Sequence, residues 1–326
     1  MPAVEAPIHS WYPNPQALLE RPHHTAFAID PAGSCEVDDA IEIISDSVTA
    51  DEFIARYHIA NGALLHGTPH MDIARAKAWS IYDDTGGNHE LMLEQSVIDL
   101  LSLDKHRATG VPAFMIEIEF CKEKGASNAK FGLSRVDATC MTHAQFEEGY
   151  REGNPEYMLL VNAARRIARR KGLRVPMGKD MANDMVGVHM IEANATIGMT
   201  IRDENVPILR RVHSDKAYQV WDNDVERQVL KSMGVALYDH RSNKHRGLGL
   251  RRYTHGTSPL RRFADLVTQI NIAAFIEGKE PPFCRKDLEE IAKELTAMYI
   301  QRSRPFAEEK ARYEKRQAKK HATAAA

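Results

Sequence analysis

An acidic loop between two apolar runs constrains this chain more than any other feature. The stretch AIDPAGSCEVDDAIEI, residues 28–43, carries Asp30, Glu36, Asp38 and Asp39, and its flanks have the apolar character of β-strands. Carboxylates this close repel one another, and burying them is costly unless a positive charge lies among them. The loop must therefore either lie in solvent or surround a cation.

Two interpretations of this loop remain open. Hard oxygen ligands suit Mg²⁺, with Mn²⁺ as the second choice, because these ions accept a few carboxylates and fill their other positions with water and phosphate oxygens. The alternative is an acidic surface turn without a metal. Because the flanking strands would bury both ends of the loop, burial favours the metal site, but the local pattern alone does not decide.

The two halves of the chain differ in charge. The 326-residue chain has a net charge of −2, yet residues 1–150 hold 23 acidic and 10 basic side chains, whereas residues 151–326 hold 22 acidic and 33 basic ones. Folded together, these halves could hold cations and polyphosphate in one site for metal-assisted phosphate chemistry. A chance split of solvated charge explains the asymmetry equally well, so motifs have to decide.

Hydrophobic periodicity predicts an α+β fold with strands mostly early in the chain and helices mostly late. Strands are expected at 25–30, 40–44, 53–60, 113–120 and 131–139, and helices at 157–172, 184–201, 224–233 and 288–302. No linker or repeat divides the chain. We therefore expect one domain over residues 25–310, preceded by an extended N-terminal arm (1–24) and followed by a basic C-terminal tail (311–326).

The sequence indicates a cytoplasmic protein without membrane contact. Its N-terminus has no basic region followed by an apolar run, and no window approaches the roughly 20 apolar residues that a membrane helix needs. The cysteines form no CxxC pair and are expected to be reduced thiols; they are Cys35, Cys121, Cys140 and Cys284.

A second motif, GLGLRRYTHGTSPLRRFADLVTQI at 247–270, is rich in arginine. Ser258 followed by Pro259 predicts a helix start with the serine as N-cap. Arg261 and Arg262 would then lie in the first turn, where they oppose the helix dipole unless an anion compensates. A phosphate would fit there, and so would an acid from elsewhere in the chain, such as the acidic loop.

Three further side chains have no decisive pattern. His58 and His255 lack metal-ligand spacing and are interpreted as packed, hydrogen-bonded histidines. Tyr82 suits a core aromatic position or a base-stacking platform equally well.

In chain order, these stretches resemble the catalytic RNB domain of the ribonuclease II and ribonuclease R family of 3'-to-5' exoribonucleases. AIDPAGSCEVDDAIEI is similar to the family's acidic motif, YHIAN to its H-I-A-D strand and SIY to its S-x-Y segment. YTHGTSPLRRFADLV resembles the long motif Y-x-x-x-T-S-P-I-R-R/K-Y-x-D-L/M. The resemblance extends over residues 25–310 and implies an RNB-type fold with a mixed β-sheet core surrounded by helices.

The resemblance implies a metal centre in the acidic loop. Asp30, Glu36, Asp38 and Asp39 match the positions that hold two Mg²⁺ ions, and Asp38 is also expected to be catalytic. Arg261 matches the arginine that contacts the reacting phosphate.

The resemblance also implies that RNA is the substrate. Tyr82 matches the tyrosine that stacks on bases near the 3' end, and Arg261 and Arg262 are expected to bind RNA. The implied activity is Mg²⁺-dependent hydrolysis of single-stranded RNA 3' ends to nucleoside 5'-monophosphates.

Departures from the family pattern leave an alternative open. Glu36 stands in place of an aspartate, Asn61 replaces the aspartate after H-I-A, and Gln269 stands where a histidine is usual. The chain is therefore expected to be either an active, retuned nuclease or a catalytically weakened RNB fold that acts as an RNA-binding or regulatory subunit.

Family exoribonucleases also carry OB-fold cold-shock and S1 domains, for which this chain has no room. We therefore expect substrates to be short RNAs or structured RNA 3' ends, such as tRNA or rRNA precursors. A protein partner or the basic C-terminal helix is expected to replace the missing RNA grip.

Overall fold

The structure is a computed structural model that describes most of the chain. The described residues are 19–46, 52–82, 89–105, 109–122, 125–203, 205–213, 236–241, 244–299 and 301–302. The helix expected at 224–233, the first 18 residues of the expected arm and the basic tail lie outside these ranges.

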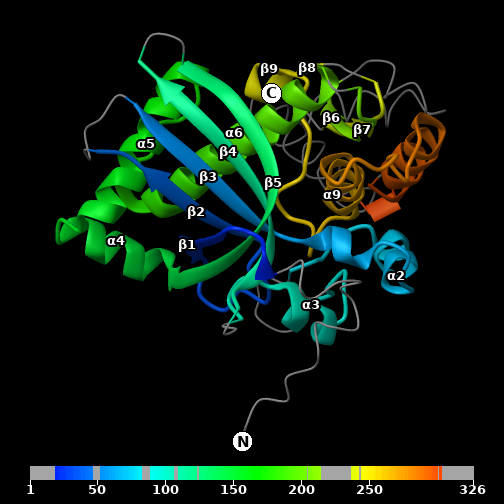
Figure 1. Cartoon of the computed structure of the whole chain (residues 1–326), viewed down its shortest axis with the longest axis horizontal. Helices are drawn as coiled ribbons and strands as arrows, with labels where there is room; N and C mark the ends of the chain where they lie inside the picture. Colours follow the sequence, from blue (N-terminus) through cyan, green and yellow to red (C-terminus); the bar gives the residue numbers. More distant parts are fainter. Residues whose placement is uncertain are drawn as a thin grey trace, which may run out of the picture.

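Five strands form a closed barrel (Figure 1). They are β1 (His23–Asp30), β2 (Asp39–Ile44), β3 (Phe53–Ala60), β4 (Val111–Cys121) and β5 (Gly125–Thr142). Consecutive strands pair antiparallel, and β1 pairs parallel with β5 to close the barrel. All five expected strands are present and the sheet is mixed as predicted, but its closure was not predicted.

Three helices cover one side of the barrel: α4 (His143–Arg151), α5 (Pro155–Lys171) and α6 (Met181–Asp203). Tyr57 and Phe114 of the barrel share a hydrophobic cluster with Leu160 of α5 and Met185 of α6. The chain leaves α5 through Gly172 at φ 66°, a left-handed conformation that glycine adopts without strain. The expected helix at 157–172 is therefore confirmed, with its start two residues earlier.

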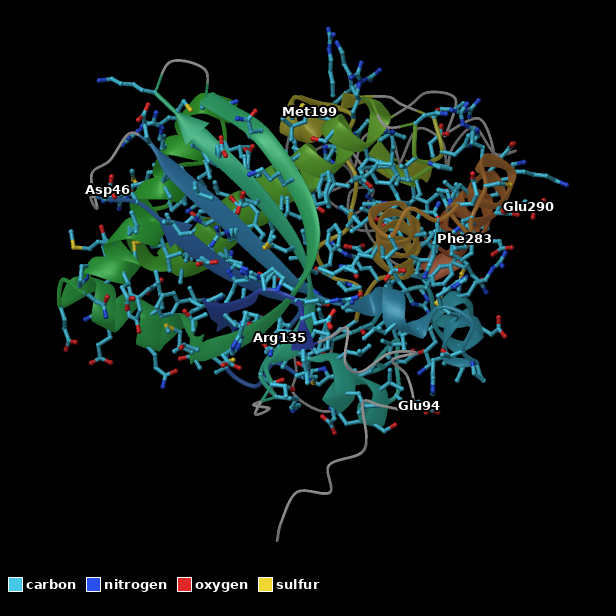
Figure 2. All side chains as sticks on the ribbon, in the orientation of Figure 1. Asp46, Glu94, Arg135, Met199, Phe283 and Glu290 are labelled. Carbon is cyan, nitrogen blue, oxygen red and sulfur yellow. The ribbon has the colours of Figure 1, made fainter. Side chains whose placement is uncertain are left out.

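A second group of helices packs at the other side of the barrel (Figure 1). It comprises η2 (Gly62–Leu65), α2 (His70–Lys77), α3 (Gln95–Leu101), α9 (Phe263–Ile276) and the helical run 285–299. The remaining elements are short: η3 (Gly178–Asp180), β6 (Arg210–Val212), β7 (Leu237–Asp239), β8 (Lys244–His245), η4 (Arg246–Leu248) and β9 (Leu250–Arg251). Charged side chains such as Asp46, Glu94 and Glu290 are exposed at the periphery (Figure 2).

The barrel interior combines small apolar residues with charged ones. Along β3, Tyr57 and Ile59 pack toward α5 and α6, so Arg56, His58 and Ala60 point to the opposite, inner face.

The described cysteines are all free thiols, as expected. None of the helices in the described ranges combines the length and apolarity that a bilayer span requires.

Candidate active site

One cavity of about 590 Å³ brings together all the site residues predicted from the sequence. Its walls are the end of β1, the loop into β2, the segment at Tyr82, one face of α6 and the turn before α9. The predicted residues on these walls are Asp30, Glu36, Asp38, Asp39, Tyr82, Arg261 and Arg262. The acidic loop and the arginine motif, far apart in sequence, therefore face the same space.

Asp38 joins the acidic loop to the arginine motif. Its Oδ1 accepts a hydrogen bond from the backbone N–H of Leu260 at 2.9 Å, and its Oδ2 accepts one from Arg261 Nε at 3.1 Å. The Asp38 side chain is 3% exposed, whereas that of Arg261 is 43% exposed. Arg261 therefore pairs with an acid of the loop and still presents an accessible guanidinium to the cavity.

The prediction that a helix begins at Ser258 is wrong. The helix α9 begins at Phe263, and Arg262 is its extended N-cap residue. Asp265 Oδ1 accepts hydrogen bonds from Ser258 N–H at 2.9 Å and from Arg262 Nη2 at 2.8 Å. Because aspartates already bind backbone N–H groups of this segment, it remains a turn, and both arginines precede the helix.

Tyr82 lies at the edge of the cavity against Glu36. Its hydroxyl donates a hydrogen bond to Glu36 Oε1, and its side chain is 40% exposed. Glu36 Oε2 is buried and has no hydrogen-bond partner among the described residues. A buried carboxylate oxygen without a donor is a position where a bound cation would be stabilised.

The positive charges near the other carboxylates of the cavity do not fully offset their burial. Burial raises the pKa of Asp30 to about 6, of Asp38 to about 7 and of Asp39 to about 8. Arg261 opposes this rise in each case, but by less than burial contributes, and neighbouring carboxylates contribute to the rise. A divalent cation would relieve both the desolvation and the repulsion.

The chemistry of the donor set fits hard divalent ions. In the part of the chain that the structure describes, no three of these four acids bring ligand atoms within 4.8 Å of one another, so the acids do not form one compact ligand group as they stand. Carboxylate oxygens, including the unpartnered Glu36 Oε2, are the ligands that Mg²⁺ and Mn²⁺ prefer.

Two buried amides position the turn before α9: Asn194, which the sequence analysis missed, and Gln269, which it noted only as a departure from the family pattern. Asn194 of α6 accepts a hydrogen bond from Gly256 N–H at 2.8 Å and donates one to Thr257 Oγ1 at 3.0 Å. Gln269 of α9 donates to Gly256 O at 3.1 Å and accepts from Gly62 N–H at 3.0 Å. Each of these amides is a polar side chain within an otherwise apolar helical stretch. This pattern is the sequence signal that could have indicated their buried, positioning role.

Comparison with known proteins identifies the domain. The family model for the RNB domain matches residues 216–278, which include Arg261, Arg262 and Gln269. This segment of the chain therefore matches part of an RNB domain. The matched residues do not include the acidic loop. The contacts of Asp38 with Leu260 and Arg261 are what connect this loop to the matched segment.

The RNB domain is similar to parts of longer proteins. It is 34% identical over 79 residues to ribonuclease R of Helicobacter pylori, an alignment that covers 24% of this chain and 12% of that protein. Its fold matches Mycoplasma genitalium RNase R with a TM-score of 0.71 at 20% identity, over 88% of this chain and 57% of that one.

Yeast Ssd1, a pseudonuclease, has the same fold, with a TM-score of 0.67 at 15% identity over 86% of this chain and 43% of Ssd1. The α+β RNB fold predicted from the sequence is therefore confirmed. The chain spans 57% of the Mycoplasma genitalium RNase R chain and 43% of the Ssd1 chain.

Proposed function

We propose that this RNB domain is a metal-dependent 3'-to-5' exoribonuclease that releases nucleoside 5'-monophosphates. The observation that carries the proposal is the double contact of Asp38 with Leu260 and Arg261. This double contact places the buried carboxylates of the acidic loop beside the accessible guanidinium of Arg261 in one cavity. Anionic metal ligands next to a cationic phosphate ligand suit the hydrolysis of a phosphodiester.

The four acids would hold the metal, with Mg²⁺ proposed and Mn²⁺ as its substitute. Such ions, when bound by Asp30, Glu36, Asp38 and Asp39, supply an activated water and neutralise charge on the phosphate. Arg261 is oriented by its Nε contact with Asp38, and its exposed guanidinium would bind the reacting phosphate.

Tyr82 and Arg262 would contribute to RNA binding. The Tyr82 ring is fixed by its hydroxyl contact with Glu36 and exposed enough to stack on a base near the 3' end. Arg262 adds a second positive charge to the cavity wall, held there by Asp265. The similar Mycoplasma genitalium RNase R has been solved with single-stranded and with double-stranded RNA, which supports an RNA substrate.

We further propose that the substrates are short RNAs or structured RNAs with single-stranded 3' ends, such as tRNA or rRNA precursors, in the cytoplasm. The chain spans 57% of Mycoplasma genitalium RNase R. The described cavity would bind the 3' end itself, and the basic C-terminal segment or a protein partner would extend the grip on the RNA.

The alternative is an RNB fold that binds RNA without cleaving it. Two observations favour it: Tyr82 already occupies one oxygen of Glu36, and the pseudonuclease Ssd1 has the same fold. This alternative predicts RNA binding without nucleotide release at any Mg²⁺ or Mn²⁺ concentration.

A time course on 5'-labelled RNA separates the two functions. A short single strand and a stem with a 3' overhang are incubated with Mg²⁺ or with EDTA, using wild type, Asp39→Asn and the exposed control Asp72→Asn. We expect a ladder that shortens from the 3' end with wild type and the control, and intact RNA with EDTA or Asp39→Asn. Intact RNA in all lanes, with binding retained, would establish the non-cleaving alternative.

A further inference from the structure

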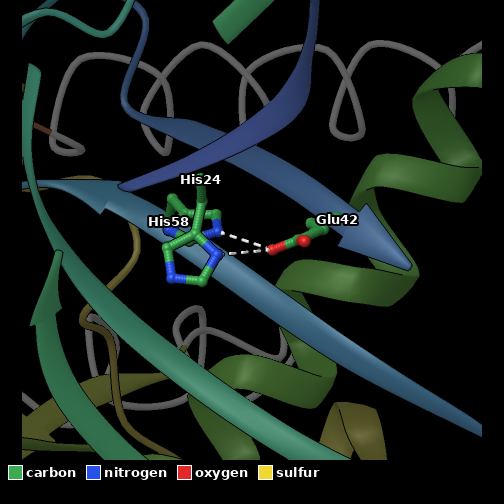
Figure 3. A group of neighbouring side chains, drawn as sticks. All are labelled: His24, Glu42 and His58. Atoms are coloured by element: carbon green, nitrogen blue, oxygen red, sulfur yellow. Dashed lines mark hydrogen bonds and ion pairs between the residues drawn. The ribbon is translucent and has the colours of Figure 1, made fainter. Parts of the chain in front are cut away.

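A second group of metal-binding side chains lies inside the barrel, away from the cavity. His24 on β1, Glu42 on β2 and His58 on β3 each offer one ligand atom, and these atoms lie within 4.8 Å of one another (Figure 3). Figure 3 shows both imidazoles turned toward the same carboxylate. We call these three residues the barrel cluster.

The distances within the barrel cluster match those between neighbouring ligands of a tetrahedral metal ion. His24 Nδ1 is 3.1 Å and His58 Nε2 is 3.3 Å from Glu42 Oε2. Zinc bonds to nitrogen and oxygen are about 2.0–2.1 Å long, which puts adjacent tetrahedral ligands about 3.3–3.4 Å apart. We propose that the barrel cluster binds a divalent transition metal, with Zn²⁺ as the ion that its two imidazoles and one carboxylate suit best.

Ser134 on β5 holds His58 in the orientation that metal binding requires. Its Oγ lies 3.1 Å from His58 Nδ1, and both side chains are fully buried. When Nδ1–H donates to Ser134, Nε2 keeps its lone pair directed at Glu42. Hydrogen bonds of this kind fix the ring orientation and tautomer of metal-binding histidines.

The surrounding charges leave one oxygen of Glu42 for the metal. Arg56 Nη1 lies closer to Glu42 Oε1, at 3.3 Å, than to Oε2, at 3.5 Å. The charge of Arg56 is also met by Glu117 Oε2, 2.7 Å from its Nε, while Lys130 binds Glu117 Oε1 at 3.0 Å. Glu42 Oε2 therefore lies between the two histidines, while the shorter contact of Arg56 is made with the other oxygen, Oε1.

A metal at the barrel cluster would strengthen the seam where strand pairing is shortest. In the described residues, β1 and β2 share one register pair, Phe27 with Ile41, whereas β2 and β3 pair from Asp39 to Ile44. His24 and Glu42 stand on the two strands of that short seam. The metal would therefore have a structural role in closing the barrel.

The barrel cluster is separate from the proposed nuclease centre. Along β1, His24 and Asp30 are six residues apart, which corresponds to about 20 Å of strand. Along β2, Asp39 and Glu42 are three residues apart, or about 10 Å. A metal at the barrel cluster is thus a different ion from those proposed for the cavity.

Zinc titration of the full chain tests this proposal. Protein stripped with EDTA and dialysed is titrated with Zn²⁺ by calorimetry in excess Mg²⁺, which blocks the carboxylate cavity. We expect one zinc ion per chain and a higher thermal midpoint with zinc than with Mg²⁺ alone. Co²⁺ in place of zinc should give visible absorption bands with nitrogen coordination. A folded wild-type protein that binds no zinc overturns the proposal without any variant.

Matched variants locate the ion. His24→Asn removes one ligand, while His23→Asn is the control, because His23 lies next to it on the opposite face of β1 and pairs with Asp137 at 2.9 Å. We expect His24→Asn to lower zinc affinity at least about 100-fold and to lose the thermal shift, as should Glu42→Gln. His23→Asn and Asp39→Asn should keep both. Zinc binding that survives His24→Asn but is lost in Asp39→Asn would place the ion in the cavity and contradict the proposal.

Discussion

The cavity and the barrel cluster both bury carboxylates, but in opposite electrostatic settings. In the cavity, burial and then the neighbouring Asp30 raise the pKa of Asp39 to about 8. Burial acts on Glu42 as well, yet its hydrogen bond with His58 and the charge of Arg56 bring its pKa below the ordinary value. The positive charges of the barrel thus outweigh the burial of Glu42, whereas the arginines of the cavity do not offset the burial of its acids, and we propose that cations from solution do so.

This difference also separates the ions that the two regions suit. The cavity offers carboxylate oxygens, which favour Mg²⁺ and Mn²⁺, whereas two imidazoles in the barrel cluster favour Zn²⁺. Substituting one acid in each region should therefore have different consequences. Loss of a cavity acid should abolish nucleotide release, whereas loss of the barrel acid should lower the free energy of unfolding.

The largest effect is expected from Asp39→Asn. Removing this carboxylate takes away one proposed metal ligand, so nucleotide release should fall at least about 100-fold, while the fold is retained. Single-turnover assays at saturating Mg²⁺, with circular dichroism of the same sample, measure both quantities. Asp72→Asn should match wild type, and an active Asp39→Asn protein would remove Asp39 from the metal site.

Arg261→Ala should have the next largest effect. Arg261 binds Asp38 in the cavity much as Arg56 binds Glu42 in the barrel, but only Arg261 is also proposed to bind phosphate. Loss of one charge-stabilising group typically lowers kcat about 10²–10³-fold. Arg75→Ala is a matched control, because Arg75 is also 43% exposed and also pairs with an acid, Glu294. Equal kcat values for the two variants would rule out the proposed role of Arg261.

Glu42→Gln should destabilise the protein. It leaves Arg56 and both histidines without their shared carboxylate, and the loss of a partly buried charged partner costs about 1–3 kcal/mol. Urea unfolding in EDTA measures this change, with Glu294→Gln as the exposed control, for which less than about 1 kcal/mol is expected. If the two substitutions cost the same, the charges inside the barrel are screened by solvent, and the contrast with the cavity is lost.

Local patterns in the sequence predicted the elements but not how they are brought together. The strand β3 runs over Phe53–Ala60 as expected, and α5 ends at Gly172, because alternation and the left-handed preference of glycine are local properties. Barrel closure by β1 and β5 depends on pairing between distant segments. The start of α9 was predicted too early in the chain. The backbone N–H groups of Ser258 and Leu260 donate to Asp265 and Asp38, and this segment forms a turn before the helix.

The two candidate sites also differ in how far local sequence patterns could predict them. The cavity acids were predictable because they are adjacent in sequence and the motif is specific. His58 was interpreted as a packed histidine without metal-ligand spacing, and its neighbours His24 and Glu42 attracted no attention, because the three residues come from three different strands. Strand register, and not sequence spacing, brings them together.

The smallest expected effect is the dependence of the thermal midpoint on pH, which should amount to a few degrees. Since the pKa values of Asp30, Asp38 and Asp39 are raised to about 6, 7 and 8, the native state binds more protons than the unfolded chain between about pH 4 and 8. These carboxylates therefore make the metal-free protein less stable as pH rises through that window. Burial lowers the pKa of His58 in the barrel, so this residue acts with the opposite sign as pH rises toward its ordinary value of about 6.5.

Comparing Asp39→Asn with wild type isolates the cavity from the histidines, which both proteins share. In EDTA, the two thermal midpoints should nearly coincide at pH 5, where Asp39 is protonated, and Asp39→Asn should melt higher at pH 8.5, where Asp39 is charged. Saturating Mg²⁺ should raise the midpoint of wild type more than that of the variant, because the metal neutralises the carboxylate that the variant lacks. A difference between the two proteins that does not change with pH would mean that Asp39 is already neutralised by the protein, and the cavity would then resemble the barrel.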